Sequence, residues 1–177
     1  MFKKIAATEI CNRAESRDVF TVVSVICLEL HSFSATLGAM SKTLPAWRFV
    51  SFAEAEVEPV PPGKTHFWQC KPGMVRDTNL MFVRCQLEPG AAHKFHHHPK
   101  MEEILYILSG TAEQWVEQEK KIMKAGDAFY VPAGVVHATF NAGSDKLDFL
   151  AILSPAQSEG PVTVEVGDQE PWKSLKK

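Results

Sequence analysis

A chain of 177 residues, 45% of them hydrophobic and 23% charged, has the length and composition of one globular domain with its own core. The formal net charge of −2 at pH 7 argues against a nucleic-acid-binding protein, because binding to phosphates requires a basic surface. The longest apolar run of the N-terminal region, residues 19–30, is shorter than the ~20 residues that span a bilayer. We therefore expect neither nucleic acid nor a membrane among the partners.

The N-terminal region differs in character from the rest of the chain. It shows no clear amphipathic period, and Met40-Ser41-Lys42 reads like the start of a bacterial-type protein. We expect residues 1–45 to be a weakly ordered or processed extension and residues 46–177 to be the folded domain. The acidic residues Glu9, Glu15 and Asp18 fit neither a secretory signal nor a transit peptide, so we expect a cytoplasmic protein. A targeting segment remains the alternative.

The four cysteines are Cys11, Cys27, Cys70 and Cys85, and no two of them form a CxxC pair. A disulfide-stabilised scaffold usually has densely spaced cysteines in a shorter secreted chain. We therefore expect reduced thiols, and a bridge between Cys70 and Cys85 is the less favoured alternative.

Residues 54–63 contain three prolines and three glutamates, which predicts a linker or an edge strand. A central strand is excluded, because proline cannot donate a hydrogen bond to the neighbouring strand.

From about residue 80 onward, short apolar runs alternate with turns that contain glycine or proline, and no helical period competes with this pattern. Many short strands separated by regular turns predict an all-β sandwich or barrel. The expected strands are 80–87, 94–98, 103–109, 111–117, 120–123, 128–131, 137–141, 147–153 and 162–166.

Histidine and glutamate side chains are expected to meet inside this barrel. His96 and His98 are two residues apart in a strand and share one face, whereas His97 points to the other face. Glu103 shares a face with the apolar residues two and four positions further on, so it points inward. A buried carboxylate is costly unless a positive charge compensates it. A divalent metal held by His96, His98, Glu103 and His137 would supply that charge, and this mixed ligand set suits Fe, Mn, Ni or Zn.

The remaining histidines and Glu102 are not expected to bind the metal. His31 and His66 are isolated histidines and are expected at the surface or in satisfied contacts. His93 is expected at the pocket rim or behind the ligands. Glu102 has the wrong parity for the site and is expected to face solvent.

The first part of this pattern resembles the first cupin motif, G(X)5HXH(X)3,4E(X)6G. The motif is met by Gly90, His96, His98, Glu103 and Gly110, all at permitted spacings.

The second cupin motif, G(X)5PXG(X)2H(X)3N, is met by Gly126, Pro132, Gly134, His137 and Asn141. The resemblance implies a small single-domain metal-binding cupin, with the jelly-roll barrel also called a double-stranded β-helix, and it implies the same four metal ligands. Asn141 is expected to fix a turn and not to bind metal.

The resemblance leaves the reaction open, because cupins include oxygenases, isomerases, lyases and binding proteins. An interior built from Leu105, Ile107 and either Phe129 or Tyr130 suits a small organic substrate. Arg84 and Lys94 are the only evident inward cations that a phosphosugar would need. We therefore favour a dioxygenase-like oxidoreductase, with a ligand-binding or sensor module and a metal-dependent isomerase or lyase as alternatives.

Cupins are often dimeric, so we expect a homodimer. An apolar outward face could form its interface, unless this face packs within the fold. Ile104, Tyr106 and Leu108 form this face, and Phe67 and Trp68 are further residues that could serve the dimer.

Overall fold

The computed structural model describes residues 43–175. The expectations about the N-terminal extension, its targeting signals, His31, Cys11 and Cys27 lie wholly or mainly outside these residues. Within residues 43–175, no helix has the length and apolarity that a bilayer crossing requires.

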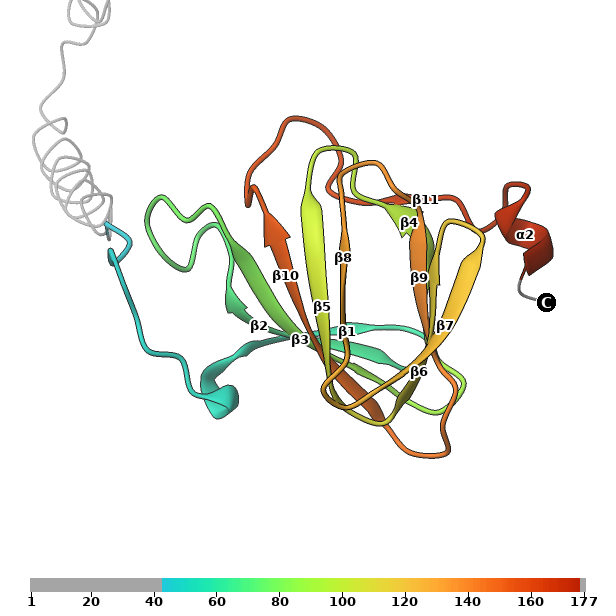
Figure 1. Cartoon of the computed structure of the whole chain (residues 1–177). Helices are drawn as coiled ribbons and strands as arrows, with labels where there is room; N and C mark the ends of the chain where they lie inside the picture. Colours follow the sequence, from blue (N-terminus) through green and yellow to red (C-terminus); the bar gives the residue numbers. More distant parts are fainter. Residues whose placement is uncertain (1–42, 176–177) are drawn as a thin grey trace, which may run out of the picture. The chain divides into compact units, whose positions relative to one another are not determined.

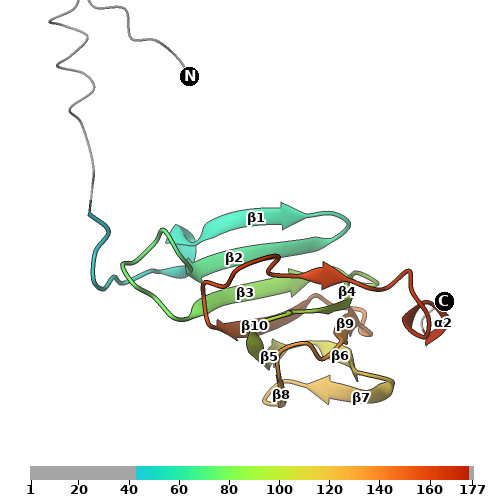
Figure 2. The ribbon, with the colours of Figure 1, turned by 90° about the horizontal axis from the view of Figure 1, so that it is seen from above.

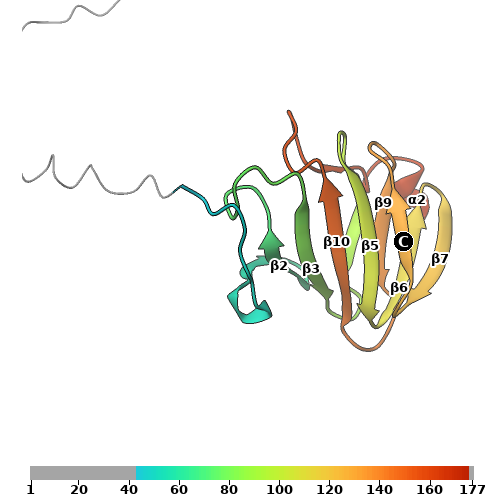
Figure 3. The same cartoon turned by 60° about the vertical axis from the view of Figure 1, so that its left-hand side comes forward.

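Eleven strands of residues 43–175 form two antiparallel sheets that face each other (Figure 1). The first sheet has six strands in the order β1-β2-β3-β10-β5-β8, and Figure 3 shows several of them side by side. Their bounds are β1 Glu56–Val60, β2 Lys64–Cys70, β3 Met81–Leu87, β10 Leu147–Ser154, β5 Glu102–Ser109 and β8 Ala128–Val131.

The second sheet has five strands in the order β11-β4-β9-β6-β7. Their bounds are β11 Val164–Glu165, β4 Ala92–His97, β9 His137–Asn141, β6 Thr111–Val116 and β7 Glu119–Lys124. Consecutive strands often lie in different sheets, as β3 and β4 do, and Figure 2 shows the resulting two-layered barrel from above. This is the predicted all-β jelly-roll fold.

The main core lies between the two sheets. Strand β3 alternates buried and half-buried residues along its whole length, and strand β5 alternates buried and exposed residues from Glu102 to Ile107. Their inward side chains, among them Cys85, Leu105 and Ile107, pack against Phe149 of β10. Phe129, and not Tyr130, contacts this core, because Tyr130 is 56% exposed. Period-two alternation therefore assigned the inward face of the central strands correctly.

A second apolar cluster covers the outer face of the five-stranded sheet. Phe95, Trp115 and Ala138 form its buried centre, and Trp172 of the short helix α2 (Trp172–Leu175) packs against it. Phe95 and Trp172 stack with their ring centroids 5.7 Å apart. The C-terminal segment is thereby attached to the barrel.

Each of the nine predicted strands agrees with an observed strand to within two residues at each end. The structure adds strand β2 to this set. The proline-rich segment contains the edge strand β1, with Pro59 inside it. Strand β2 was not predicted from the sequence, because all seven of its residues are half-buried and no alternation marks it. Cys70 and Cys85 are free thiols, as expected.

Trp68 corrects one of the dimer-face expectations. It is half-buried and packs against the core, so it is not free to serve a dimer interface as expected. Ile104 and Tyr106 do face outward and are 44% and 42% exposed.

Candidate metal centre

Four side chains from three strands converge inside the barrel. His96 lies in β4, His98 directly follows that strand, Glu103 lies in β5, and His137 begins β9. One nitrogen or oxygen atom from each lies within 4.8 Å of those of the other three. None of the four residues is more than 4% exposed. The structure therefore brings together all four residues that the sequence selected.

Backbone pairing explains why these residues meet. His96 and His137 are direct partners in the pairing of β4 with β9. The turn before β9 is joined to the end of β4, because the backbone N–H of Gly134 donates to the carbonyl oxygen of His98 at 2.8 Å. Glu103 comes from the opposite sheet and points across the barrel. This direction was predicted because Glu103 and Leu105 are two residues apart and share the inward face of β5.

A backbone carbonyl fixes each imidazole ring through its Nδ1 atom. Nδ1 of His96 lies 2.6 Å from the oxygen of Lys94, and Nδ1 of His137 lies 3.1 Å from that of Val135. Nδ1 of His98 lies 2.7 Å from the oxygen of Val162. A carbonyl only accepts, so Nδ1 carries the hydrogen and the Nε2 lone pair of each ring is directed toward the cluster.

The inward atoms of the cluster have no hydrogen-bond partner among the described residues. These atoms are Nε2 of the three histidines and Oε2 of Glu103. The Glu103 oxygen lies 2.9 Å from Nε2 of His137 and 3.3 Å from Nε2 of His98. Buried polar atoms without partners are costly, and a cation would satisfy all four. The residues therefore fit a divalent transition metal.

The same proximity shifts the pKa values of the cluster. Burial alone would raise the pKa of Glu103, but its close contacts with His137 and His98 outweigh burial and lower the pKa to about 2. Burial and the neighbouring His137 lower the pKa of His96 to about 3. Burial opposes protonation of His98, yet its contact with Glu103 raises the pKa overall. At neutral pH the site therefore presents an anionic carboxylate and a neutral His96, as metal ligation requires.

These shifts predict how the stability of the metal-free protein depends on pH. The unfolded chain protonates His96 near its ordinary pKa of 6.5, whereas the folded protein resists protonation until about pH 3. Between these values the unfolded state binds more protons, so stability falls on acidification by up to about 1.4 kcal/mol per pH unit. Glu103 adds to the loss between its ordinary pKa of 4.5 and about 2. His98 opposes the loss only above pH 6.5, because the stability that its raised pKa contributes is already complete below that value.

We expect His96 and the similarly shifted His93 to outweigh His98. Thermal unfolding in the presence of a chelator should therefore show a lower Tm at pH 5 than at pH 7. A Tm that rose on acidification would contradict this assignment of the buried histidines.

A small pocket of about 200 Å³ reaches the cluster at His98 and Glu103. One wall is apolar and comes from Met81 and Val83 of β3 and from Ala151 and Leu153 of β10. Neither lysine nor arginine lines this pocket among the described residues. Arg84 instead points to the other face of β3, where it forms an ion pair with Asp148. The pocket is therefore suited to a small ligand without phosphate groups.

Polar residues of the neighbouring strands β1 and β2 also line the pocket, and they were not selected from the sequence. Glu58, His66 and Trp68 line the pocket. His66 had been expected in an ordinary role, but it lies on the same face of β2 as Trp68, two residues further along. The two-residue spacing of His66 and Trp68 was visible in the sequence. It indicates a shared face only if the segment is a strand, and β2 had not been predicted.

His93 also lines the pocket, as expected for a residue behind the ligands. A β-bulge shifts the pairing of β4 with β9 between His93 and His96. The two rings stack with their centroids 4.0 Å apart. Lys94 is exposed and does not line the metal pocket, so the bulge gives the interior a histidine where unbroken alternation would have placed a lysine.

Two further expectations are confirmed. Glu102 is exposed and accepts a hydrogen bond from the Tyr130 hydroxyl at 2.8 Å. Asn141 fixes a turn: its Oδ1 accepts from the Gly143 N–H at 2.9 Å, and its Nδ2 donates to the carbonyl oxygens of Leu87 and Asp145.

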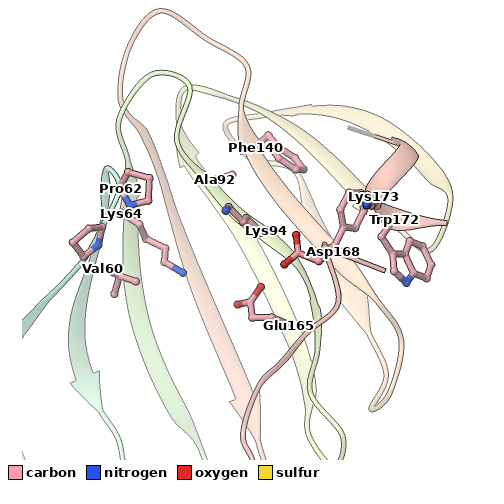
Figure 4. A pocket seen from close by; sticks show the side chains of 13 residues that line it. Val60, Pro62, Lys64, Ala92, Lys94, Phe140, Glu165, Asp168, Trp172 and Lys173 are labelled. Carbon is pink, nitrogen blue, oxygen red and sulfur yellow. The ribbon is translucent and has the colours of Figure 1, made fainter. Parts of the chain in front are cut away.

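A second, larger hollow of about 560 Å³ lies between the turn after β1, strand β4 and the C-terminal segment (Figure 4). Lys64, Lys94, Glu165 and Asp168 contribute charged groups to it. None of the four cluster residues lines this hollow. The four-residue cluster therefore adjoins the smaller pocket and not this hollow.

Comparison with known proteins agrees with this geometry. Residues 83–153 match the family model described as "Cupin domain". A germin-like protein from Morus alba is 33% identical over 87 residues, which cover 46% of this chain and 42% of that protein. The oxalate-binding protein of Thermotoga maritima is 34% identical over 73 residues, which cover 41% of this chain and 60% of that protein. The chain thus spans less than two thirds of the length of these relatives.

A solved structure of Bacillus subtilis oxalate decarboxylase, described for its Mn(II) centers, superposes with a TM-score of 0.57 at 25% sequence identity. The superposition covers 66% of this chain and 31% of that one. The similarity therefore concerns one barrel of a larger protein.

Proposed function

Since this protein belongs to the cupin family, we propose that it is a metal-dependent enzyme acting on a small organic substrate that binds its metal through neighbouring oxygen atoms. The proposed ligands are His96, His98, Glu103 and His137, holding one divalent transition metal. The observation that carries the proposal is the convergence of three imidazole nitrogens and one carboxylate oxygen, all buried and all without protein partners, beside a small pocket.

Ligand chemistry limits the choice of metal. Three imidazoles and one carboxylate suit Fe, Mn, Ni or Zn, and they leave coordination positions open for substrate. The Mn(II) centers named for the similar oxalate decarboxylase support a divalent metal. When bound, such a metal would act as a Lewis acid and, if redox-active, as a route for electrons.

The pocket favours a dioxygenase-like oxidoreductase. An apolar cavity of ~150 Å³ holds a benzene molecule, so a pocket of about 200 Å³ can take a catechol or a diol of similar size. Its wall of Met81, Val83 and Leu153 is apolar, and no lysine or arginine among the described residues lines the pocket to bind a phosphate. Small phenols and diols are therefore the first substrates to test.

Two alternatives keep specific support. The polar wall with Glu58, His66 and His93 would also serve the proton transfers of an isomerase or lyase. The name of the Thermotoga maritima relative favours a binding protein without turnover. A cytoplasmic location and a homodimer remain predictions.

The test measures O2 uptake by protein reconstituted separately with Fe(II), Mn(II), Ni(II) and Zn(II), on a panel of catechols, phenols and short diols. We expect substrate-dependent uptake with at least one redox-active metal and none with zinc. His97→Ala is the matched control, because His97 lies between two proposed ligands but is not part of the cluster. Turnover with zinc under anaerobic conditions would move the assignment to an isomerase or lyase. Tight binding without any product would favour the binding module.

A further inference from the structure

Two side chains at the edge of the six-stranded sheet form a hydrogen-bonded pair on the pocket wall. Glu58 lies in the edge strand β1 and His66 in β2 beside it (Figure 2). Nδ1 of His66 lies 3.1 Å from Oε2 of Glu58, and the same oxygen accepts a hydrogen bond from Nε1 of Trp68 at 2.7 Å. All three residues line the pocket that reaches His98 and Glu103. Neither Glu58 nor His66 belongs to the metal cluster.

The hydrogen bonds determine which nitrogen of His66 is available. Hydrogen bonds from Trp68 and His66 lower the pKa of Glu58, so this group is a carboxylate at neutral pH and can only accept. Nδ1 of His66 must therefore carry the hydrogen, and Nε2 keeps its lone pair. No described residue donates a hydrogen bond to this Nε2. The pair thus presents an unused proton acceptor.

The surroundings of His66 keep it neutral in the absence of a ligand. Burial lowers the pKa of His66 and outweighs the opposing effect of Glu58, and the nearby positive charge of Lys64 in the same strand lowers it further. Cys85 faces His66 from β3, and its buried thiol has a raised pKa and is neutral. His93 faces it from β4, with ring centroids 6.2 Å apart, and burial lowers the pKa of His93 as well.

We infer that Glu58 and His66 form a proton-accepting pair for a hydroxyl group of the substrate as that group binds in the metal pocket. The O–H bond breaks, its electron pair stays on the substrate oxygen, and the proton moves to Nε2 of His66. The resulting imidazolium donates from Nδ1 to the Glu58 carboxylate, whose negative charge stabilises it. Trp68 is a positioning residue, because its indole N–H fixes the accepting oxygen of Glu58.

This inference rests on the proposed function, and it also names a property of the substrate. An ionisable hydroxyl on a catechol, phenol or diol would be bound as the anion without releasing its proton to solvent. A substrate without an ionisable hydroxyl group would not be bound more tightly because of Glu58 and His66.

The hydrogen bonds could instead serve only to join β1 to β2, and the test must separate the two roles. Glu58→Gln keeps the size of the side chain and removes its charge, and His66→Gln removes the proton acceptor. Glu56→Gln is the matched control, because Glu56 is an exposed carboxylate of the same strand that pairs with Lys71. Zinc content and Tm are measured for every variant.

The probe is 4-nitrocatechol, whose visible spectrum reports ionisation of its hydroxyl groups, added to zinc-loaded protein between pH 5.5 and 8. We expect the wild-type protein to bind the ionised form at a pH where the free probe is largely neutral. His66→Gln should weaken binding about tenfold at the low-pH end, or shift its pH midpoint upward by about one unit, with zinc retained. Glu58→Gln should act in the same direction, and Glu56→Gln should match wild type.

A second readout uses the metal-free protein. Long-range ¹H–¹⁵N NMR spectra should show His66 protonated at Nδ1 in the wild type and a changed tautomer ratio in Glu58→Gln. Identical pH profiles for all variants with zinc bound would overturn the inference and leave the proposed metal site standing. A wild-type protein that holds neither zinc nor any of Fe(II), Mn(II) and Ni(II) would overturn the proposed function and this inference with it.

Discussion

His98→Ala is expected to abolish stoichiometric metal binding, the largest single effect that this structure predicts. The substitution removes one of four converging donors and leaves Glu103 without the imidazole 3.3 Å from its Oε2. Loss of a residue that merely supports a ligand costs 10–100-fold in metal affinity, so loss of a ligand itself should exceed ~100-fold. Elemental analysis should find about one metal per wild-type chain and a small fraction of that in the variant.

Controls separate ligand loss from unfolding. His97→Ala should retain metal, and a near-native Tm of chelator-treated His98→Ala would show that the barrel survives. Metal addition should raise the Tm of the wild type and of His97→Ala but not that of His98→Ala, because only a folded, complete site gains stability from the ligand. Full metal content in His98→Ala would refute the four-ligand site.

Gly110→Ala is expected to destabilise the barrel more than any other single methyl addition at a described glycine. Gly110 joins β5 to β6 with φ of +87°, and an added Cβ would lie 2.9 Å from both the Leu147 Cα and the Lys146 carbonyl oxygen. Both obstructing atoms belong to the backbone, so no side-chain rotation relieves the contact. Backbone strain and overpacking each cost about 1–3 kcal/mol, and we expect their combination here.

Gly126→Ala provides the matched comparison. Gly126 has φ of +92°, but nothing lies within 4 Å of its added Cβ, so only the conformational cost remains. Urea unfolding of metal-free protein should show a loss of about 1–3 kcal/mol for Gly126→Ala and at least twice that loss for Gly110→Ala. Equal losses would mean that the close approach to β10 contributes nothing.

The sequence was sufficient to predict the cluster because its members lie on strongly patterned strands. Glu103 shares one face of β5 with the apolar residues Leu105 and Ile107, so its inward direction could be predicted from the two-residue period of a strand. His96 and His98 are two residues apart and lie beyond the bulge in β4, so their shared face could be predicted from spacing.

The rest of the pocket could not be predicted, for two physical reasons. Strand β2 is half-buried on both faces, so no periodicity identified it or directed attention to His66 and Trp68. The bulge in β4 breaks the alternation on which the placement of His93 and Lys94 depended. Neither a β-bulge nor a strand that is half-buried on both faces produces a regular hydrophobic pattern, so neither can be recognised from a single sequence.

The carbonyl of Val162 that orients His98 lies beyond residue 153, where the match to the cupin family model ends. Thr163 stands beside the same ring, with its hydroxyl oxygen 3.4 Å from Nδ1. The smallest unit that can be transplanted with its metal affinity intact is therefore longer than the recognisable family module. Substitutions in the segment that returns from β10 to β11 offer a way to tune the metal without altering any ligand. In engineered or natural variants, this segment is where differences in metal preference should first be sought.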